Sequence, residues 1–492
     1  MAERKLSTFE RLRKGQMPRN RRERREIERR LNAPDPGLEI VYPDAAGIDV
    51  GQNSHHVCVP PGGDPRPVRE FGCWTQALEE MAQWLRSGRI RTVVMQSTGV
   101  YWMGVYDVLQ PHGLEVHLVD ARATKNVPGR KSDVQECQWR MKLDTYGLLR
   151  QCFLPAPAVH AVRTVWRLRE QHLRDAARCI QHMPKALTEM NVQLHVALSD
   201  ISGVSGQAII RAILAGQRDP KTLAALRDPR CQASEEEFVA SLQGNWKPDV
   251  RFELQPAVDA YDFYHQQLAR CDQQLRIYLK LMPDGTAKFH SLSASPVEPL
   301  TREAKQKKRR GQKALMPSPK TEAEPEFDLE QELVRILGVN PMSSIDGIGV
   351  VTVMTVISEV GADLSPWETG KRWVSWRNLA PKRDVSGGKV IRHVRPKHNN
   401  RIANAFRLGA QSLQHKDSYL GARFRYLVAK LGKPKAIKAM ARYLACLYYR
   451  LITKGQAFVD QGAAVFEQKR RQRELASLER RAQNIGYKVV AA

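Results

Sequence analysis

Between residues 39 and 155, short apolar runs alternate with amphipathic stretches. The runs predict strands at residues 46–51, 56–59, 91–95 and 114–119. Apolar residues at positions 78, 81, 82 and 85 recur with helical spacing and predict a helix over residues 75–85. Strands that alternate with helices favour an α/β layer with parallel strands. The first folded part of the chain is therefore predicted to be an α/β domain over residues 39–155.

A different pattern begins at Trp166. Apolar positions step by three and four residues up to Leu194, at 166, 169, 173, 176, 180, 183, 187, 190 and 194, and Arg169 is the polar member. Such a heptad seam predicts a coiled coil or a long helical hairpin, with a kink at Pro184. Its partner is either a second helical pattern at about residues 252–282 or a helix of another subunit. The preferred interpretation of this seam is plain packing or dimerisation.

The rest of the chain divides by composition. The predicted parts are a basic N-terminal arm at 1–38, the α/β domain at 39–155, a coiled-coil region at 156–283, a linker or mobile loop at 284–327, a mostly helical domain at 328–455 and a basic tail at 456–492. The linker is rich in Pro, Ser, Lys and Glu. The arm is rich in Arg and poor in apolar residues, which suits contact with phosphate or simple exposure to solvent.

Charge and composition narrow the class of protein. The formal net charge of +26 makes a polyanion the leading partner. No apolar run reaches the roughly 18 residues of a membrane-spanning helix, and the charged N-terminus lacks the apolar core of a signal peptide. We therefore expect no membrane association and a cytoplasmic location. The 8 cysteines form no Cys-x-x-Cys pair, which argues against structural zinc and a disulfide framework.

Three acidic residues are candidates for a metal site. Asp49 lies on the first predicted strand, which ends at Gly51, and Ser132 with Gln135 reads as a capping box that begins a helix. Asp133 and Glu136 then share one face of the first helical turn, where the helix dipole alone favours negative charge. If Asp49 joins them, the three carboxylates could hold two Mg²⁺ ions about 4 Å apart for phosphodiester cleavage.

Gln96 stands where the third predicted strand ends. The segment at residues 95–102 is predicted to close this strand and to open a helix at Gly99 and Val100. Active-site groups of α/β sheets gather at such strand ends.

Two glycine-containing motifs stand out in the C-terminal half. The Gly-x-Gly pattern at residues 345–350 precedes a helical run to Val360, and is either a phosphate-binding turn or an ordinary glycine turn. Ser386 precedes two glycines that would let a DNA backbone approach closely. A nucleophilic serine needs a base or cations nearby. Taken by itself, Ser386 is more typical of a turn residue, although basic side chains surround it at Lys382, Arg383, Lys389 and Arg392.

Together these motifs resemble a known family. The chain is similar to the DEDD transposases of bacterial insertion sequences, the one-ten family of bridge-RNA-guided recombinases. The resemblance rests on seven motifs in the family's order, at residues 47–51, 97–102, 125–133, 181–183, 209–216, 345–349 and 386–389. It implies a RuvC-like, ribonuclease-H-like α/β domain, a helical coiled-coil insertion and a mostly helical C-terminal transposase domain. Alternatives are a catalytically silent nucleic-acid-binding relative and a RuvC-like junction nuclease.

The resemblance also assigns roles to residues. Asp49 takes the place of the family's first acid, and Asp133 and Glu136 those of the third and fourth. Gln96 stands where the family has its second acid, a glutamate. These four would be the ligands of Mg²⁺ or Mn²⁺, with weaker binding because Gln96 lacks a charge. Ser386 takes the place of the serine that attacks DNA and forms a covalent phosphoserine link, so that the family's active centre combines metal ligands and serine.

The resemblance finally implies partners. These are duplex DNA as donor and target, a structured non-coding RNA that chooses both, and further copies of the chain, as a dimer and as a tetramer on DNA. The expected location is the bacterial cytoplasm at the nucleoid. The side chains expected to contact nucleic acid are Arg130, Lys131, Lys382, Arg383, Lys389 and Arg392.

Overall fold

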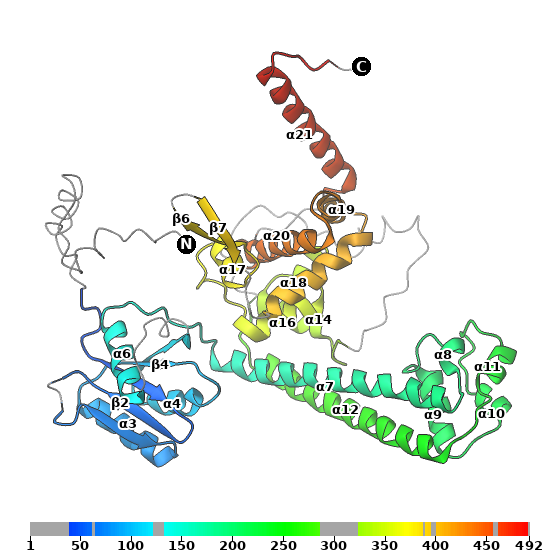
Figure 1. Ribbon diagram of the computed structural model, residues 1–492, viewed down its shortest axis with the longest axis horizontal. Helices are drawn as coiled ribbons and strands as arrows, with labels where there is room; N and C mark the ends of the chain where they lie inside the picture. The colour runs from blue at the N-terminus through cyan, green and yellow to red at the C-terminus, as the bar shows by residue number, and fades with distance from the viewer. Residues whose placement is uncertain are drawn as a thin grey trace, which may run out of the picture. The chain divides into compact units, whose positions relative to one another are not determined.

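A computed structural model of the chain describes residues 39–61, 64–121, 132–285, 323–386, 389–394, 400–455 and 461–490. The chain divides into two compact units between Leu154 and Pro155, and each is described by itself (Figure 1). The predicted arm at 1–38 and most of the predicted linker at 284–327 lie outside the described residues.

The first unit is built on one five-stranded sheet with the strand order β3-β2-β1-β4-β5. The strands are β1 (Ala45–Val50), β2 (Ser54–Cys58), β3 (Val68–Gly72), β4 (Thr92–Gln96) and β5 (Glu115–Val119). β1, β4 and β5 are parallel, whereas β2 and β3 are antiparallel to their neighbours. The expectation of parallel strands therefore holds for two of the four strand pairings in this sheet. This mixed sheet is consistent with a ribonuclease-H-like domain.

The edge strand β3 was not among the predicted strands. Its sequence, Val-Arg-Glu-Phe-Gly, has no apolar run, and none of its residues is fully buried. It forms because its backbone pairs with β2, from Ser54 opposite Gly72 to Cys58 opposite Val68. An edge strand needs no apolar face of its own when a neighbour supplies the hydrogen-bonding register.

Helices cover both faces of the sheet, and the alternation of side chains along β1 decides which helix meets which face. Ala46 and Ile48 point into the core that contains α3 (Thr75–Ser87) and α4 (Trp102–Leu109). Gly47 and Asp49 point to the opposite face, which α6 (Asp133–Thr145) covers. A Cβ at Gly47 would lie 2.2 Å from the carbonyl oxygen of Cys137, so the glycine allows α6 to approach β1 closely.

The starts of α6 and α4 can be compared with the helix starts predicted from the sequence. The Ser132 hydroxyl accepts a hydrogen bond from the Gln135 backbone N–H, so Ser132 is the N-cap of α6, as predicted. The prediction that a helix opens at Gly99 is wrong, because Gly99 has φ of +58° and α4 begins at Trp102. A left-handed residue cannot belong to a right-handed helix, so Gly99 forms the turn before it.

A buried ion pair joins β5 to α6 below the strand ends. The His117 ring is fully buried, and its Nδ1 lies 2.9 Å from Asp144 Oδ2. Burial lowers the pKa of His117, but hydrogen bonds and the charges of Asp144 and Glu115 outweigh it and raise the pKa above 6.5. The pair therefore favours a protonated imidazole in the folded state.

This pair predicts a pH dependence of stability. Because the pKa of His117 is higher folded than unfolded, its contribution is complete below about pH 6.5 and is lost as pH rises through the folded pKa. We expect urea unfolding of the native chain to require less urea at about pH 9 than at about pH 6. His117→Gln should reduce this difference. An equal loss in both proteins would contradict the assignment.

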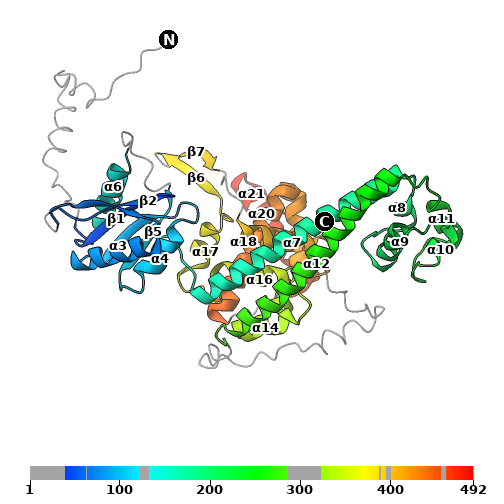
Figure 2. The same ribbon diagram turned by 90° about the horizontal axis from the view of Figure 1, so that it is seen from below.

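The second unit begins with two long helices that lie side by side, as Figures 1 and 2 both show. They are α7 (Pro157–Glu189) and α12 (Pro248–Lys280). The partner of the predicted seam is thus the later helix of the same chain, and α7 runs through Pro184 without ending. The polar seam residue Arg169 is buried, and its Nε donates to Asp272 Oδ1 of α12 at 2.5 Å.

Short helices close one end of this pair, and further helices form the rest of the unit. The short helices are α8 (Leu194–Ala197), α9 (Val204–Leu214), α10 (Pro220–Ala224) and α11 (Glu235–Ser241). The C-terminal helices are α14 (Leu329–Leu337), α15 (Pro341–Ser344), α16 (Val350–Val360), α17 (Gly370–Trp376), α18 (Arg401–Gln411), α19 (Tyr419–Leu431), α20 (Lys433–Lys454) and α21 (Ala463–Asn484), with a 3₁₀ turn at Ser412–His415.

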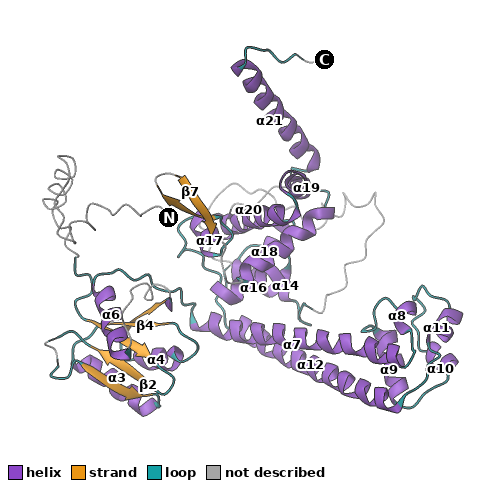
Figure 3. Cartoon of the chain, in the orientation of Figure 1, coloured by secondary structure: helices purple, strands orange, loops and turns teal. Residues whose placement is uncertain are grey.

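This unit has one described pair of strands, β6 (Lys382–Ser386) and β7 (Lys389–Val394), which stand out among the helices in Figure 3. The largely buried α16 lies against α7 and α18. None of the helices in the described ranges combines the length and apolar character that crossing a bilayer requires.

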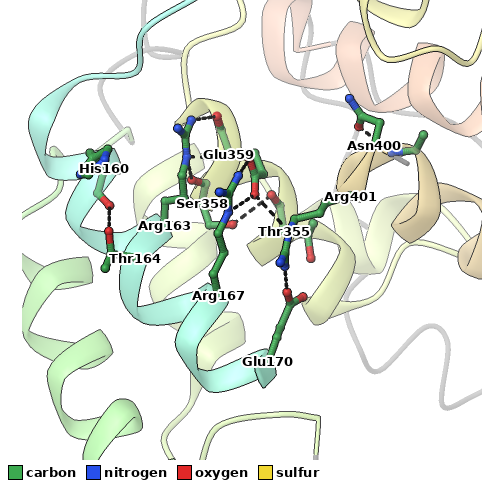
Figure 4. A network of polar contacts seen from close by, with 11 residues as sticks. His160, Arg163, Thr164, Arg167, Glu170, Thr355, Ser358, Glu359, Asn400 and Arg401 are labelled. Atoms are coloured by element: carbon green, nitrogen blue, oxygen red, sulfur yellow. Dashed lines mark hydrogen bonds and ion pairs between the residues drawn. The ribbon is translucent and has the colours of Figure 1, made fainter. Parts of the chain in front are cut away.

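Glu359 of α16 ties the long helices to the C-terminal helices (Figure 4). Its carboxylate accepts two hydrogen bonds from Arg167, at 2.9 and 2.7 Å, and its backbone carbonyl accepts one from Arg163 at 2.5 Å. Arg401 of α18 pairs with Glu170 of α7 in the same network. Paired, partly buried charges of this kind fix the direction in which packed helices meet.

The glycine turn before α16 has a packing role. Gly347 has φ of +84°, and a Cβ there would lie 2.6 Å from the carbonyl oxygen of Gly409 on α18. Both features require glycine, because the backbones of the turn and of α18 approach each other closely. Packing therefore requires glycine at position 347, and the phosphate-binding alternative for this turn stays a prediction.

Candidate functional site

Two polar side chains meet at one edge of the sheet because their strands are parallel neighbours. Ile48 of β1 lies opposite Met95 of β4, so the residues that follow them, Asp49 and Gln96, lie at the same level. Gln96 is the last residue of β4, and Asp49 is the last but one of β1. The carboxyl ends of parallel strands are where α/β folds gather functional groups. Asp49 was predicted to lie on a strand and Gln96 at a strand end, and the structure brings the two side chains to one place.

Arg140 of α6 lies at the centre of this place. One guanidinium nitrogen, Nη1, donates to Asp49 Oδ1 at 2.7 Å and to the Ile48 carbonyl at 3.3 Å. The other, Nη2, donates to Gln96 Oε1 at 2.9 Å and to Glu136 Oε2 at 2.5 Å. The Arg140 side chain is only 3% exposed. Asp49, Gln96 and Glu136 therefore converge on one buried cation of the chain itself. We call these four residues the Arg140 cluster.

The orientation of the Gln96 amide follows from its other contact. Gln96 Nε2 donates to the Thr98 hydroxyl at 2.6 Å, which leaves Oε1 to face Arg140. Gln96 is 8% exposed, so its polar atoms need partners within the protein. A glutamate at this position could not donate to Thr98 in its charged form.

Asp133, the third predicted acid, does not join the cluster. Its side chain is 70% exposed, and its Oδ2 lies 3.9 Å from Nδ1 of the His56 ring. His55 is buried beside the site, and burial lowers its pKa although the charge of Asp49 opposes the change. His55 is therefore neutral near pH 7.

The predicted metal site can be tested against this geometry. Mg²⁺ needs oxygen ligands at about 2.0–2.1 Å, with free lone pairs directed at the ion. Here Asp49, Gln96 and Glu136 each direct an oxygen at Arg140. Among the described residues, no group of three or more His, Cys, Asp or Glu side chains is arranged to hold a metal ion. The residues as arranged fit a guanidinium and do not fit Mg²⁺.

Arg140 was not among the predicted site residues, although two features of α6 point to it. It lies four residues after Glu136, a spacing that pairs opposite charges on a helix. It also falls within the buried stripe of α6, with Cys137, Met141 and Asp144. A charged residue in a buried stripe must have a partner, since an unpaired buried charge is very costly.

Ser386 ends β6 and is exposed. It lies opposite Lys389, the first residue of β7, and the Arg383 and Lys389 side chains are also exposed. Arg392 donates from Nε to Asp384 Oδ2 at 2.6 Å across the strand pair. The two strands thus hold the serine at their tip among basic side chains. Of the other predicted contacts with nucleic acid, Arg130, Lys131 and the Lys382 side chain lie outside what the structure describes.

A second basic feature is a groove between α19 and α21, with a volume of about 300 Å³. Phe466 anchors α21 by packing edge-on against Tyr419 and Tyr426, with ring centres 5.2 and 6.0 Å apart. The groove is lined by Arg423, Tyr426, Leu427, Lys430, Phe466, Arg470, Arg473, Glu474 and Ser477. Four cations beside the half-buried ring of Tyr426 suit the phosphates of a nucleic acid.

Comparison with protein families decides the class of this chain. One family model, described as Transposase, matches residues 46–192, and a second, described as Transposase IS116/IS110/IS902 family, matches residues 326–425. The chain belongs to the IS110 family of transposases. No curated protein matches it. A transposase cuts and rejoins DNA, so DNA is a partner of this chain.

The two matched segments contain both parts of the candidate site. The first covers the sheet and α6 with the Arg140 cluster, and the second covers the strand pair that carries Ser386. DEDD transposases typically use a divalent metal ion, whereas Asp49, Gln96 and Glu136 of this chain contact Arg140. Helices α9 to α12 and α20 to α21 lie outside the matched segments.

Proposed function

We propose that this transposase recombines the DNA of its insertion sequence through a phosphoserine intermediate on Ser386, under the guidance of a structured non-coding RNA. The observation that carries the proposal is the placement of Ser386 at an exposed strand end, opposite Lys389 and near Arg383, within a segment matched by the transposase family. An exposed hydroxyl among cations suits attack on a phosphodiester.

In this reaction each bond to phosphorus that breaks is replaced by a new one. Ser386 Oγ attacks a DNA phosphorus, a serine–phosphate bond forms, and the bond from phosphorus to one deoxyribose oxygen breaks. The serine proton is transferred, through a base or water, to the released oxygen, which becomes a hydroxyl. When a hydroxyl from another strand attacks the phosphoserine, the steps reverse and the strands are rejoined. Lys389 and Arg383 would stabilise the negative charge that develops on the phosphoryl oxygens.

The Arg140 cluster has no step in this mechanism. The residues present do not fit Mg²⁺ or Mn²⁺, so we assign the cluster a structural role in the first unit. The same observation favours a second function, a catalytically silent relative that binds nucleic acid without recombining it. A junction nuclease of the RuvC type is the weaker rival, since it gives Ser386 no role.

The guidance by RNA and the assembly are proposed on charge and family resemblance. A chain of net charge +26 is suited to bind RNA and duplex DNA together. We propose a dimer of the chain, and a tetramer when two DNA sites are brought together, in the cytoplasm at the nucleoid.

The function is tested by recombination between donor and target plasmids. The purified chain is combined with both plasmids and with transcripts of the DNA that flanks its gene. We expect junction products only when a flanking transcript is present, and we expect their sequence to change with substitutions in that transcript. DNA binding with no junction product in any combination would favour the silent relative. Junctions that do not depend on the transcript would refute guidance by RNA.

The groove between α19 and α21 is proposed as a surface for the nucleic-acid backbone. Arg470→Ala and Arg473→Ala should each weaken binding of duplex DNA or structured RNA and lower the slope of log affinity against log salt by about 1. The matched control is Arg481→Ala, an exposed arginine on the same helix that does not line the groove. Filter binding over a salt series measures both quantities. Equal effects of all three variants would mean that the groove is no special site.

A further inference from the structure

We propose that Arg140 is an internal cation that takes the place of the divalent metal ion in this transposase, so that the Asp49 site does not bind Mg²⁺ or Mn²⁺. The inference rests on the family assignment and on the geometry of α6. It does not depend on the role of Ser386, so either proposal can fail alone.

A metal ion and the Arg140 guanidinium cannot both lie at the point where Asp49, Gln96 and Glu136 converge. Arg140 donates hydrogen bonds to Asp49 on β1 at 2.7 Å, to Gln96 on β4 at 2.9 Å and to Glu136 on α6 at 2.5 Å. A metal ion at this position would take its ligands from the same three side chains. A metal ion would also have to approach them to about 2.0–2.1 Å, which leaves no room for the guanidinium.

The charges of the Arg140 cluster also oppose a divalent ion. Asp49 and Glu136 each carry one negative charge, Arg140 carries one positive charge, and Gln96 is neutral. A divalent ion beside the guanidinium would meet a cation at close range in a partly buried place, where repulsion is stronger than in water. A glutamate at position 96 would add a third carboxylate around a single cation. The neutral Gln96 therefore suits the single positive charge of Arg140. The guanidinium explains why position 96 has no glutamate.

The Arg140 side chain is also held in its buried position. Its Nη1 is also bonded to the Ile48 carbonyl, and its side chain is 3% exposed. The helix that carries it lies so close to β1 that a Cβ at Gly47 would lie 2.9 Å from the Met141 backbone nitrogen. Exposure of the guanidinium would therefore require α6 to move away from the sheet.

The test is Mn²⁺ binding to the full chain, followed by electron paramagnetic resonance of free and bound Mn²⁺. The proteins are the native chain, Asp49→Asn, Arg140→Leu and the double variant Gln96→Glu with Arg140→Leu. We expect the native chain and Asp49→Asn to bind Mn²⁺ equally. The double variant should bind at least about tenfold more tightly than the native chain, since three carboxylates then surround a site without an internal cation.

A further Asp49→Asn change in the double variant should remove the gained binding, which separates the cluster from other Mn²⁺ sites. The inference is overturned if the native chain binds Mn²⁺ and Asp49→Asn abolishes that binding. This comparison needs no Arg140 variant, so it remains decisive if those variants do not fold. No outcome depends on recombination activity, so the result is independent of the proposed function.

Discussion

Replacing Ser386 with alanine should reduce strand exchange by at least about a thousandfold while DNA and RNA binding stay within about twofold of the native values. The hydroxyl is the group that would bond to phosphorus, and alanine offers no atom that can replace it. The side chain is exposed at the end of β6, so its removal leaves no cavity and breaks no packing. Strand exchange is measured by counting donor–target junctions, and binding by filter retention.

The matched control for this variant is Ser375→Ala, an exposed serine on α17 in the same unit. It should recombine DNA as the native chain does. If Ser386→Ala also forms junctions at the native rate, Ser386 is not the nucleophile and the transposase works by another chemistry.

Replacing Arg140 with leucine should destabilise the first unit by roughly 3 kcal/mol. The change removes one member of a buried ion cluster and leaves the carboxylates of Asp49 and Glu136 near each other without their cation. The Gln96 oxygen and the Ile48 carbonyl also lose a donor. Urea unfolding of the full chain, followed by hydrogen exchange of the strands β1 and β4, measures the loss.

Two companion variants separate charge from packing. Adding Asp49→Asn and Glu136→Gln to Arg140→Leu should recover a part of the lost stability, because no unpaired charge then remains near the sheet. Arg150→Leu, at an exposed position of the same unit, should change stability by no more than about 0.5 kcal/mol. If Arg140→Leu is as harmless as Arg150→Leu, the cluster does not hold α6 against the sheet.

Much of the first unit follows from local patterns. The apolar runs locate β1, β2, β4 and β5, and Ser132 with Gln135 marks the start of α6. Asp49 was predicted as an acid of the first strand, and the strand end at Gln96 was recognised as a place where functional groups collect. The heptad seam located α7, although its sequence could not tell whether α12 or another subunit would cover it.

What the sequence did not reveal depends on distances between elements. Arg140 contacts Asp49 only because Gly47 allows α6 to lie close to β1, and no spacing along the chain expresses that distance. Glu136 and Asp133 looked equivalent in the first turn of α6, yet the first contacts Arg140 and the second faces solvent near His56. The edge strand β3 depends on pairing with β2 and has no apolar run to mark it.

The most direct test of the account is to find the DNA that stays attached to the protein. A donor DNA with a nick beside the exchange site would allow cleavage and prevent rejoining, so that the covalent intermediate accumulates. The protein is then denatured and digested, and the peptides are analysed by mass spectrometry. The account predicts a nucleotide attached to the peptide that contains Ser386, and none in Ser386→Ala. A nucleotide on a different residue, or junction formation without any protein–DNA link, would contradict it.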